Sequence, residues 1–117
     1  MKKIYYLSTC DTCKRIMHSL NLSDDFELQD IKTQPISKYQ IEYMRSLTDS
    51  YESLFSKRAR LYKELGLKDK SLSEDNYKNY ILEHYTFLKR PVVICNDQIF
   101  IGNSKKTIEA AKKAIYE

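Results

Sequence analysis

Segments typical of β-strands lie at the two ends of this chain, and this constrains its fold more than any other feature. Lys3–Ser8 is rich in Ile and Tyr, and Phe26–Ile31 alternates apolar and polar residues, as half-buried strands do. Pro91–Cys95 and Gln98–Ile101 are two further short strands, joined at Asn96-Asp97, which favours a hairpin turn. A sheet built from these segments joins the first part of the chain to the last.

The other periodic segments have apolar residues at helical spacing. Ser37 and Ser73 are good N-caps for two of them, and Gly66 separates two others. The expected helices begin near Cys10 or Asp11, or run over 37–47, 54–65, 73–85 and 105–116. The order is a βαβ unit, a helical block and a ββα unit, which is the plan of a thioredoxin-like domain with an insertion. We therefore predict an α/β fold with a mixed four-stranded sheet, in a single domain of residues 1–117 with an inserted helical lobe at about 36–87.

The composition argues against a disordered or membrane-spanning chain. Of the 117 residues, 42% are hydrophobic and 31% are charged, which is typical of a soluble domain with its own core. The longest apolar stretch is Pro91–Cys95, far shorter than the roughly 20 residues that cross a bilayer. The apolar run Ile4–Leu7 is likewise too short for a signal peptide. We expect a cytoplasmic protein with no membrane contact.

Cys10 and Cys13 form a Cys-x-x-Cys pair where the first strand is expected to meet the first helix. The unpaired N–H groups and the positive dipole end of a helix stabilise a thiolate, so this position predicts a lowered pKa for Cys10. Cys13 lies one helical turn later, where it can attack a mixed disulfide or a sulfenic acid formed at Cys10. Lys14 and Arg15 add positive charge, and Asp11 opposes it. The pair predicts redox chemistry, with Cys10 as the nucleophile and Cys13 as the resolving thiol.

A zinc site is the main alternative for a Cys-x-x-Cys pair, because such pairs also ligate metals. A tetrahedral zinc site needs four ligands, and the further candidates are Cys95, His18 and His84. Cys95 falls in an apolar strand, where a buried cysteine usually acts as a small hydrophobe. His18 is expected at a helix surface, and His84 at a helix end, where imidazole suits the dipole. We therefore predict that the chain has no metal ligands.

The segment Lys57–Lys70 is strongly basic. Its six basic and two acidic residues leave a net charge of +4, an amount equal to the formal charge of the whole chain. A solvated helix face is the usual role of such a segment, and a site for an anion or an acidic partner is the alternative.

Four motifs resemble those of the ArsC/Spx family, in the family's order and at its spacing. They are the redox loop LSTCDTC at 7–13, the lobe motif LYKELGL at 61–67, the stretch LKRPVVI at 88–94 and the strand and turn IFIGN at 99–103. Together they cover essentially the whole chain. The resemblance implies a thioredoxin-like fold with a helical lobe, and cysteine redox chemistry.

The resemblance also implies roles for single residues. Cys10 matches the nucleophile of glutaredoxin-dependent arsenate reductases and the first redox cysteine of Spx, and Cys13 matches the second Spx cysteine, which those reductases lack. Arg90 matches an arginine that contacts the oxyanion in the reductases, and Arg58 resembles a lobe arginine of Spx. Both are therefore implied to bind an anionic group of the substrate. Pro91 matches the cis-proline that faces the active cysteine in thioredoxin-like folds.

The chain also departs from the family at positions that matter. The arsenate reductases bring three arginines to the anion, because a multiply charged oxyanion needs several charge-assisted hydrogen bonds. Here Ser56 stands at the lobe position, with Arg58 two residues later, and the third position falls at about Gly102. A glycine through which Spx contacts RNA polymerase corresponds to Ser50. The first two departures weaken an arsenate reductase assignment, and the last weakens a polymerase interface.

These observations favour a thiol–disulfide oxidoreductase or a glutathione- or glutaredoxin-linked reductase of the ArsC family. The alternative is an Spx-like redox-sensing transcriptional regulator that binds the RNA polymerase α subunit and makes no direct contact with nucleic acid. A true arsenate reductase is less favoured than either. We expect a monomer without a bound cofactor, and glutathione or glutaredoxin as the electron donor.

Overall fold

Four strands form one mixed sheet in this protein, as a computed structural model that describes residues 1–116 shows. The strands are β1 (Lys2–Tyr6), β2 (Glu27–Asp30), β3 (Val92–Cys95) and β4 (Gln98–Ile101), in the order β2-β1-β3-β4. β1 runs parallel to β2 and antiparallel to β3, which is antiparallel to β4. The predicted mixed four-stranded sheet is confirmed.

The hairpin between β3 and β4 forms at the dipeptide that predicted it. Asn96 and Asp97 have positive φ angles of 49° and 68°, and two successive positive φ angles are what a tight type I′ turn requires. Asn and Asp tolerate this conformation better than most residues. The turn therefore sets the register in which Val92 faces Ile101 and Cys95 faces Gln98.

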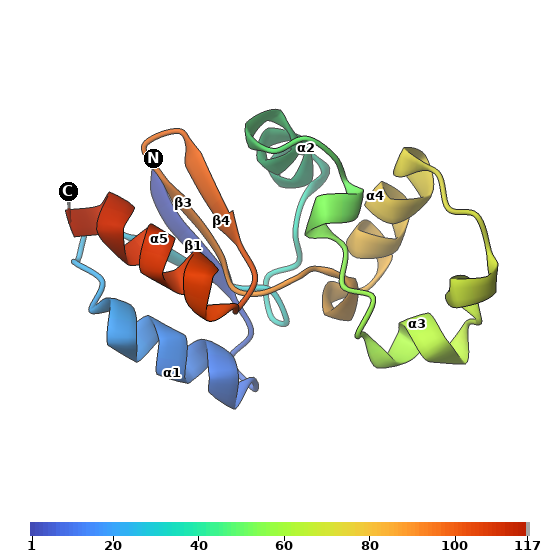
Figure 1. Ribbon diagram of the computed structural model, residues 1–117, viewed down its shortest axis with the longest axis horizontal. Coiled ribbons are helices and arrows are strands. Elements are labelled where there is room, and N and C mark those ends of the chain that lie inside the picture. Colours follow the sequence, from blue (N-terminus) through green and yellow to red (C-terminus); the bar gives the residue numbers. More distant parts are fainter. Residues whose placement is uncertain (117) are drawn as a thin grey trace. The chain divides into compact units, whose positions relative to one another are not determined.

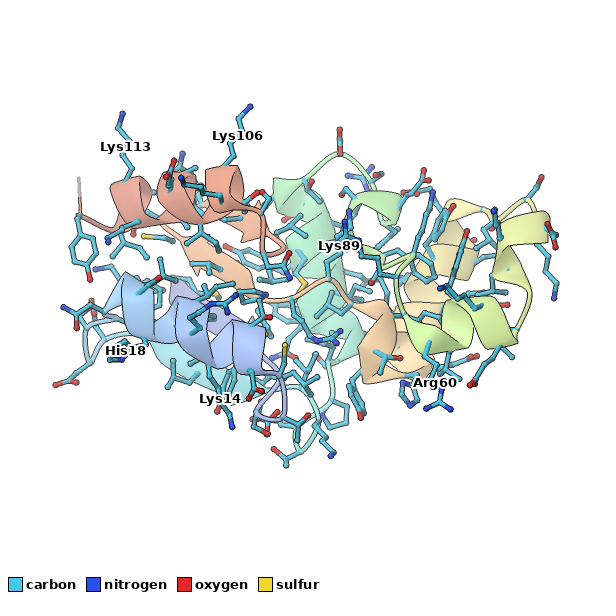
Figure 2. The ribbon with its side chains drawn as sticks, turned by 60° about the horizontal axis from the view of Figure 1, so that its bottom comes forward. Lys14, His18, Arg60, Lys89, Lys106 and Lys113 are labelled. Atoms are coloured by element: carbon cyan, nitrogen blue, oxygen red, sulfur yellow. The ribbon has the colours of Figure 1, made fainter. Side chains whose placement is uncertain are left out.

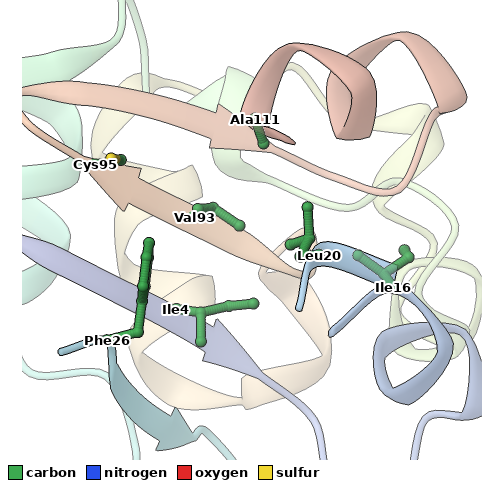
Figure 3. Packing of buried hydrophobic residues seen from close by; sticks show 7 residues of the cluster. All are labelled: Ile4, Ile16, Leu20, Phe26, Val93, Cys95 and Ala111. Carbon is green, nitrogen blue, oxygen red and sulfur yellow. The ribbon is translucent and has the colours of Figure 1, made fainter. Parts of the chain in front are cut away.

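Helices α1 (Asp11–Leu20) and α5 (Lys105–Tyr116) lie side by side on one face of the sheet (Figure 1). Between them and the strands is a hydrophobic cluster whose members come from both ends of the sequence (Figure 3). Its buried residues are Ile4, Ile16, Leu20, Phe26, Val93, Cys95 and Ala111. This shared core holds α1, and with it the Cys-x-x-Cys pair, against the strands.

The chain divides into two compact units. The sheet unit comprises Met1–Gln34 and Arg90–Glu117, of which Glu117 lies outside the described residues, and the helical unit comprises Pro35–Lys89. The bounds of the helical unit lie close to those expected for the lobe. That the chain is a single domain stays a prediction.

The helical unit contains three α-helices and three short 3₁₀ turns among the residues that the structure describes. They are α2 (Lys38–Leu47), η1 (Glu52–Leu54), α3 (Arg60–Glu64), η2 (Leu67–Asp69), α4 (Glu74–Glu83) and η3 (Tyr85–Phe87). Ser37 and Ser73 cap α2 and α4 through capping boxes with Gln40 and Asn76, as their positions in the sequence predict. None of the helices in residues 1–116 has the length and apolarity that a bilayer crossing requires.

The predicted helix over residues 54–65 is wrong in its first half. Phe55 is extended, with φ −90° and ψ 130°, and forms an isolated antiparallel bridge with Leu88. The backbone N–H of Ser56 donates to Phe87 at 2.7 Å, and that of Lys89 donates to Leu54 at 2.8 Å. These bonds satisfy the backbone from outside the segment, so helix formation is delayed until Arg60.

The predicted helix over residues 73–85 ends two residues early. His84 is extended, with φ −149° and ψ 128°, and Tyr85 begins a 3₁₀ turn. The His84 side chain accepts a hydrogen bond from the Thr86 backbone N–H at 3.2 Å. This local bond gives the backbone an alternative to a further helical turn.

Candidate active site

The loop between β1 and α1 brings Cys10 to the first turn of the helix. The backbone N–H of Cys10 donates to the carbonyl of Leu7 at 3.0 Å, which closes a tight turn over Ser8 and Thr9. The carbonyl of Cys10 then accepts the N–H of Lys14 at 3.2 Å. Cys10 is therefore the last residue before α1, beside the unpaired N–H groups of the helix.

Cys10 has a partly exposed free thiol with a pKa below its ordinary value. Partial burial acts in the opposite direction and raises the pKa, but it is outweighed by groups that favour the thiolate. These are the backbone N–H and thiol of Cys13, the positive charge of Arg90 and the backbone N–H of Thr12. The start of the helix thus stabilises a thiolate where a partner can reach it.

Cys13 has the opposite environment one helical turn later. Its side chain is fully buried, at 0% exposure, and burial raises the pKa of its thiol to about 11. Hydrogen bonding from the Leu7 backbone and the charge of Arg90 act against this rise, whereas a negative charge on Cys10 adds to it. Cys13 therefore stays protonated near neutral pH and can donate to the Cys10 sulfur.

Arg90 and Pro91 join the site from the segment that leads into β3. The Arg90–Pro91 peptide bond is cis, as the resemblance implies. The Arg90 charge lowers the pKa of both cysteines, so its guanidinium lies close enough to act on either sulfur. The carbonyl of Pro91 accepts the N–H of Gly102 at 2.9 Å, at the end of β4. Cys10, Cys13, Arg90 and Pro91 therefore all belong to the sheet unit, in which the Arg90 charge acts on both cysteines.

The sequence matches the ArsC family over residues 5–111, which is most of the chain. The chain belongs to the ArsC family. Among curated relatives, the global transcriptional regulator Spx of Streptococcus mutans is 26% identical over 112 residues, which cover 94% of this chain and 82% of the relative. The regulatory protein MgsR of Bacillus subtilis is 21% identical over 112 residues, which cover 93% and 89%.

Solved structures share the fold. An arsenate reductase from Vibrio cholerae superposes with a TM-score of 0.72 at 23% sequence identity, over 97% of this chain and 96% of that chain. A likeness at this identity shows the fold alone, and the fold is the thioredoxin-like one of the ArsC family. The proteins that resemble this chain thus include two named as regulators and one named as an arsenate reductase.

The three other candidate metal ligands of this ArsC-family chain lie in separate segments: Cys95 in β3, His18 in α1 and His84 directly after α4. Cys95 is buried in the core, 1% exposed, as expected for a small hydrophobic residue. His18 is exposed on α1, from which it and Lys14 extend outward (Figure 2). His84 belongs to the helical unit and bonds locally to Thr86. Within residues 1–116, no three His, Cys, Asp or Glu side chains are grouped so that they could hold a metal ion.

Arg58 lies in the other unit from the cysteines. It is exposed in the turn that precedes α3, and its role in binding an anionic group stays a prediction. Its neighbour Arg60, which extends from α3 (Figure 2), pairs with Glu64 at 2.8 Å.

Sequence reasoning missed two contributions to the site. The backbone of Leu7 supports both cysteines, through its carbonyl at Cys10 and its bonding to the sulfur of Cys13. The side chain of Asp30, at the end of β2, holds the backbone N–H of Ser8 at 3.2 Å. A backbone contact leaves no trace in side-chain identity. The position of Asp30 was open to inference, because the carboxyl ends of parallel strands meet at one edge of a sheet.

Proposed function

We propose that this ArsC-family protein is a thiol–disulfide oxidoreductase in which Cys10 is the nucleophile and Cys13 the resolving thiol. The observation that carries the proposal is the contrast between the two cysteines. Cys10 is accessible and has a lowered pKa, whereas Cys13 is buried with a pKa raised to about 11. Attack requires a thiolate, and resolution requires a second thiol held in reserve until the first has reacted.

The reaction follows from this contrast. The Cys10 thiolate attacks one sulfur of a partner disulfide, which forms a mixed disulfide and releases the other partner sulfur as a thiolate. Consumption of the Cys10 charge removes one of the causes that raise the pKa of Cys13. The Cys13 thiol then loses its proton and attacks Cys10, which releases the second partner thiolate and leaves a Cys10–Cys13 disulfide. Two electrons have passed from the protein to the partner, whose two thiolates take up protons.

The pair must be reduced again before another cycle, and we propose glutathione or glutaredoxin as the donor. Glutathione carries carboxylates, and Arg90 supplies a positive charge that acts on both cysteines and suits an anionic thiol partner. Arg58 is the second proposed contact to such a group. Pro91 would lie beside the partner at the Cys10 thiolate.

Glutathione disulfide tests the proposal directly. The Cys13→Ser variant should accumulate a mixed disulfide of one glutathionyl group at Cys10, because nothing resolves it. The wild-type chain should instead form an internal disulfide, and the Cys10→Ser variant should form neither product. Mass spectrometry of the intact chain and of its peptides distinguishes these species.

The matched control is Cys95→Ser, which removes a core cysteine that takes no part in the chemistry. Its products should equal those of the wild type under conditions where it remains folded. A glutathionyl adduct that forms equally well on Cys10→Ser, or no adduct on Cys13→Ser, would exclude Cys10 as the nucleophile.

A second candidate is a redox-sensing transcriptional regulator that binds RNA polymerase, with the Cys10–Cys13 disulfide as its switch. It is supported by the relatives named as regulators, Spx of Streptococcus mutans and MgsR of Bacillus subtilis. Such a regulator needs a protein-binding surface on the helical unit around Ser50–Arg60, which an enzyme does not need. Capture from cell lysate with Cys13→Ser separates the two, since an enzyme traps many thiol clients and a regulator retains polymerase subunits.

Arsenate reduction is the least favoured of the three functions. Arg90 supplies one charge at the cysteine pair, but Gly102 has no side chain to supply another at the position implied by the resemblance. Each missing charge-assisted hydrogen bond costs about 1.5–3 kcal/mol, which weakens the hold on a multiply charged oxyanion.

A further inference from the structure

Asp30 ends β2 at the edge of the sheet where β1 also ends, because the two strands are parallel and Tyr6 faces Asp30. Its Oδ1 atom accepts the backbone N–H of Ser8 at 3.2 Å and that of Lys32 at 3.2 Å. The hydroxyl of Thr33 lies 3.4 Å from the other carboxylate oxygen. One carboxylate therefore joins the loop that follows β1 to the loop that follows β2.

These bonds favour the ionised form of Asp30. Hydrogen bonds from the side chain of Ser8 hold the pKa of the carboxyl below its ordinary value; partial burial opposes them, and the backbone N–H groups of Ser8 and Lys32 add to the lowering. An ionised carboxylate only accepts hydrogen bonds, so it can serve several donors of the two loops at once.

Ser8 lies inside the turn that presents Cys10. That turn is closed by the bond from the Cys10 N–H to the Leu7 carbonyl at 3.0 Å. The lowered pKa of Cys10 depends on the N–H groups of Cys13 and Thr12, and hydrogen bonds weaken steeply when their distance or angle changes. A turn that is free to move would therefore lose these bonds to the Cys10 sulfur.

We propose that Asp30 is a positioning residue, whose carboxylate holds Ser8 and thereby fixes the turn that presents Cys10 to the amides at the start of α1. The proposal rests on the role of Cys10 as the nucleophile. The effect is one of geometry and opposes the electrostatic one, because a nearby negative charge disfavours a thiolate. Loss of positioning raises the pKa of Cys10, whereas mere loss of the Asp30 charge lowers it.

Three substitutions separate geometry from charge. Asp30→Asn keeps an oxygen that can accept from Ser8 and Lys32 but removes the charge, so Cys10 should react nearly as in the wild type. Asp30→Glu keeps the charge but displaces the carboxylate by one methylene, and Asp30→Ala removes both. In these two variants the alkylation of Cys10 near neutral pH should slow by about tenfold, the change in thiolate fraction that one pKa unit produces.

The measurement is the rate of Cys10 alkylation by iodoacetamide across pH, on chains that circular dichroism shows to be folded. Asp25→Ala is the matched control, since it removes a carboxylate of the same unit that bonds to Lys2 at 2.9 Å and to Ser23. Its Cys10 profile should equal the wild type. If Asp30→Ala does not fold, the Cys10 alkylation rates of Asp30→Asn and Asp30→Glu still distinguish geometry from charge.

Two results would overturn the inference. One is a wild-type Cys10 profile in all three Asp30 variants, and the other is retention by Asp30→Glu with loss in Asp30→Asn. Failure of the proposed function looks different. In that case Cys10 of the wild-type chain itself reacts no faster than Cys95.

Discussion

Cys10 and Cys13 are separated by two residues, and their chemistry differs because one turn of helix moves a side chain from the end of the helix to its buried face. At Cys10 the amides of the first turn and the charge of Arg90 outweigh the effect of partial burial. At Cys13 burial dominates, and the pKa of the thiol rises to about 11. In the proposed reaction, the position of each cysteine in the helix therefore decides which one attacks and which one resolves.

The pH dependence of labelling should follow from these shifts. Only a thiolate is alkylated, so a lowered pKa moves the reaction of Cys10 to a pH below the ordinary 9.0, and the raised pKa moves that of Cys13 to about 11. Cys95, which is 1% exposed, should react slowly at any pH at which the chain is folded. Iodoacetamide rates for each cysteine, resolved by peptide mass spectrometry, check this order.

Substitution of Arg90 should shift the pH dependence of Cys10 labelling in a known direction. Arg90→Ala should move the Cys10 profile to higher pH, because the arginine charge favours the thiolate. Arg90→Lys, which keeps the charge, should restore part of the shift. Lys113→Ala, in the last turn of α5, is the control for a lost surface charge.

In the wild-type chain, a Cys13 that reacts at lower pH than Cys10 would contradict the roles proposed for the two cysteines.

At the scale of elements, the sequence predicts best where local chemistry decides. The serines that cap α2 and α4 form hydrogen bonds with residues three positions later, as predicted. The Asn96-Asp97 turn depends on the φ angles of its own two residues, and it also forms as predicted. The stretch after Leu54 was mispredicted because its backbone bonds reach Phe87 and Lys89, more than thirty positions later. No pattern within the segment reports such a partner.

The same contrast holds for the site. The position of the Cys-x-x-Cys pair can be predicted from the sequence, because it follows a strand and begins a helix. The hydrogen bond from Ser8 to Asp30 cannot be predicted in this way, because it depends on the pairing of two strands. The contribution of the Leu7 backbone to both cysteines leaves no mark in the sequence at all.

Phe55 forms the isolated β-bridge with Leu88, and its side chain is buried in the core of the helical unit. It is 1% exposed, and its ring lies 4.9 Å from that of Tyr77 and 5.2 Å from that of Phe87, centroid to centroid. Phe55→Ala should therefore lower the free energy of unfolding by about 3–5 kcal/mol. Denaturant unfolding followed by circular dichroism measures this loss.

Tyr39→Ala is the control for Phe55, because that aromatic ring is 76% exposed on α2. It should change the free energy of unfolding by no more than about 0.5 kcal/mol. If Phe55→Ala does not fold, Phe55→Leu supplies a milder truncation with the same sign. A Phe55→Ala variant as stable as Tyr39→Ala would contradict the packing of the helical unit around this ring.

At the scale of the whole molecule, the basic segment Lys57–Lys70 has a net charge equal to that of the whole chain, and ion pairs neutralise part of it. In the basic segment, Lys57 pairs with Glu52 at 2.7 Å and Arg60 with Glu64 at 2.8 Å. Arg58, Lys63, Lys68 and Lys70 are exposed, and none of them has an ion pair within the part of the chain that the structure describes. These charges are available for an anionic partner, and the two kinds of side chain should serve it differently.

Arg58 should contribute more than the lysines around it. A guanidinium can hold a carboxylate or a phosphate through two parallel hydrogen bonds, whereas an exposed lysine acts mainly through long-range attraction that salt screens. Arg58→Ala should slow formation of the mixed disulfide with glutathione disulfide in the Cys13→Ser background by about tenfold, the lower end of the cost of a lost charge-assisted hydrogen bond. Stopped reactions analysed by intact mass give the rate.

Lys63→Ser, the matched control, should change the rate little and mainly reduce its dependence on salt. Arg58→Lys, which keeps the charge without the planar fork, should fall between them. If Arg58→Ala and Lys63→Ser have equal effects, or none, the whole segment Lys57–Lys70 is a solvated surface and Arg58 has no part in the reaction.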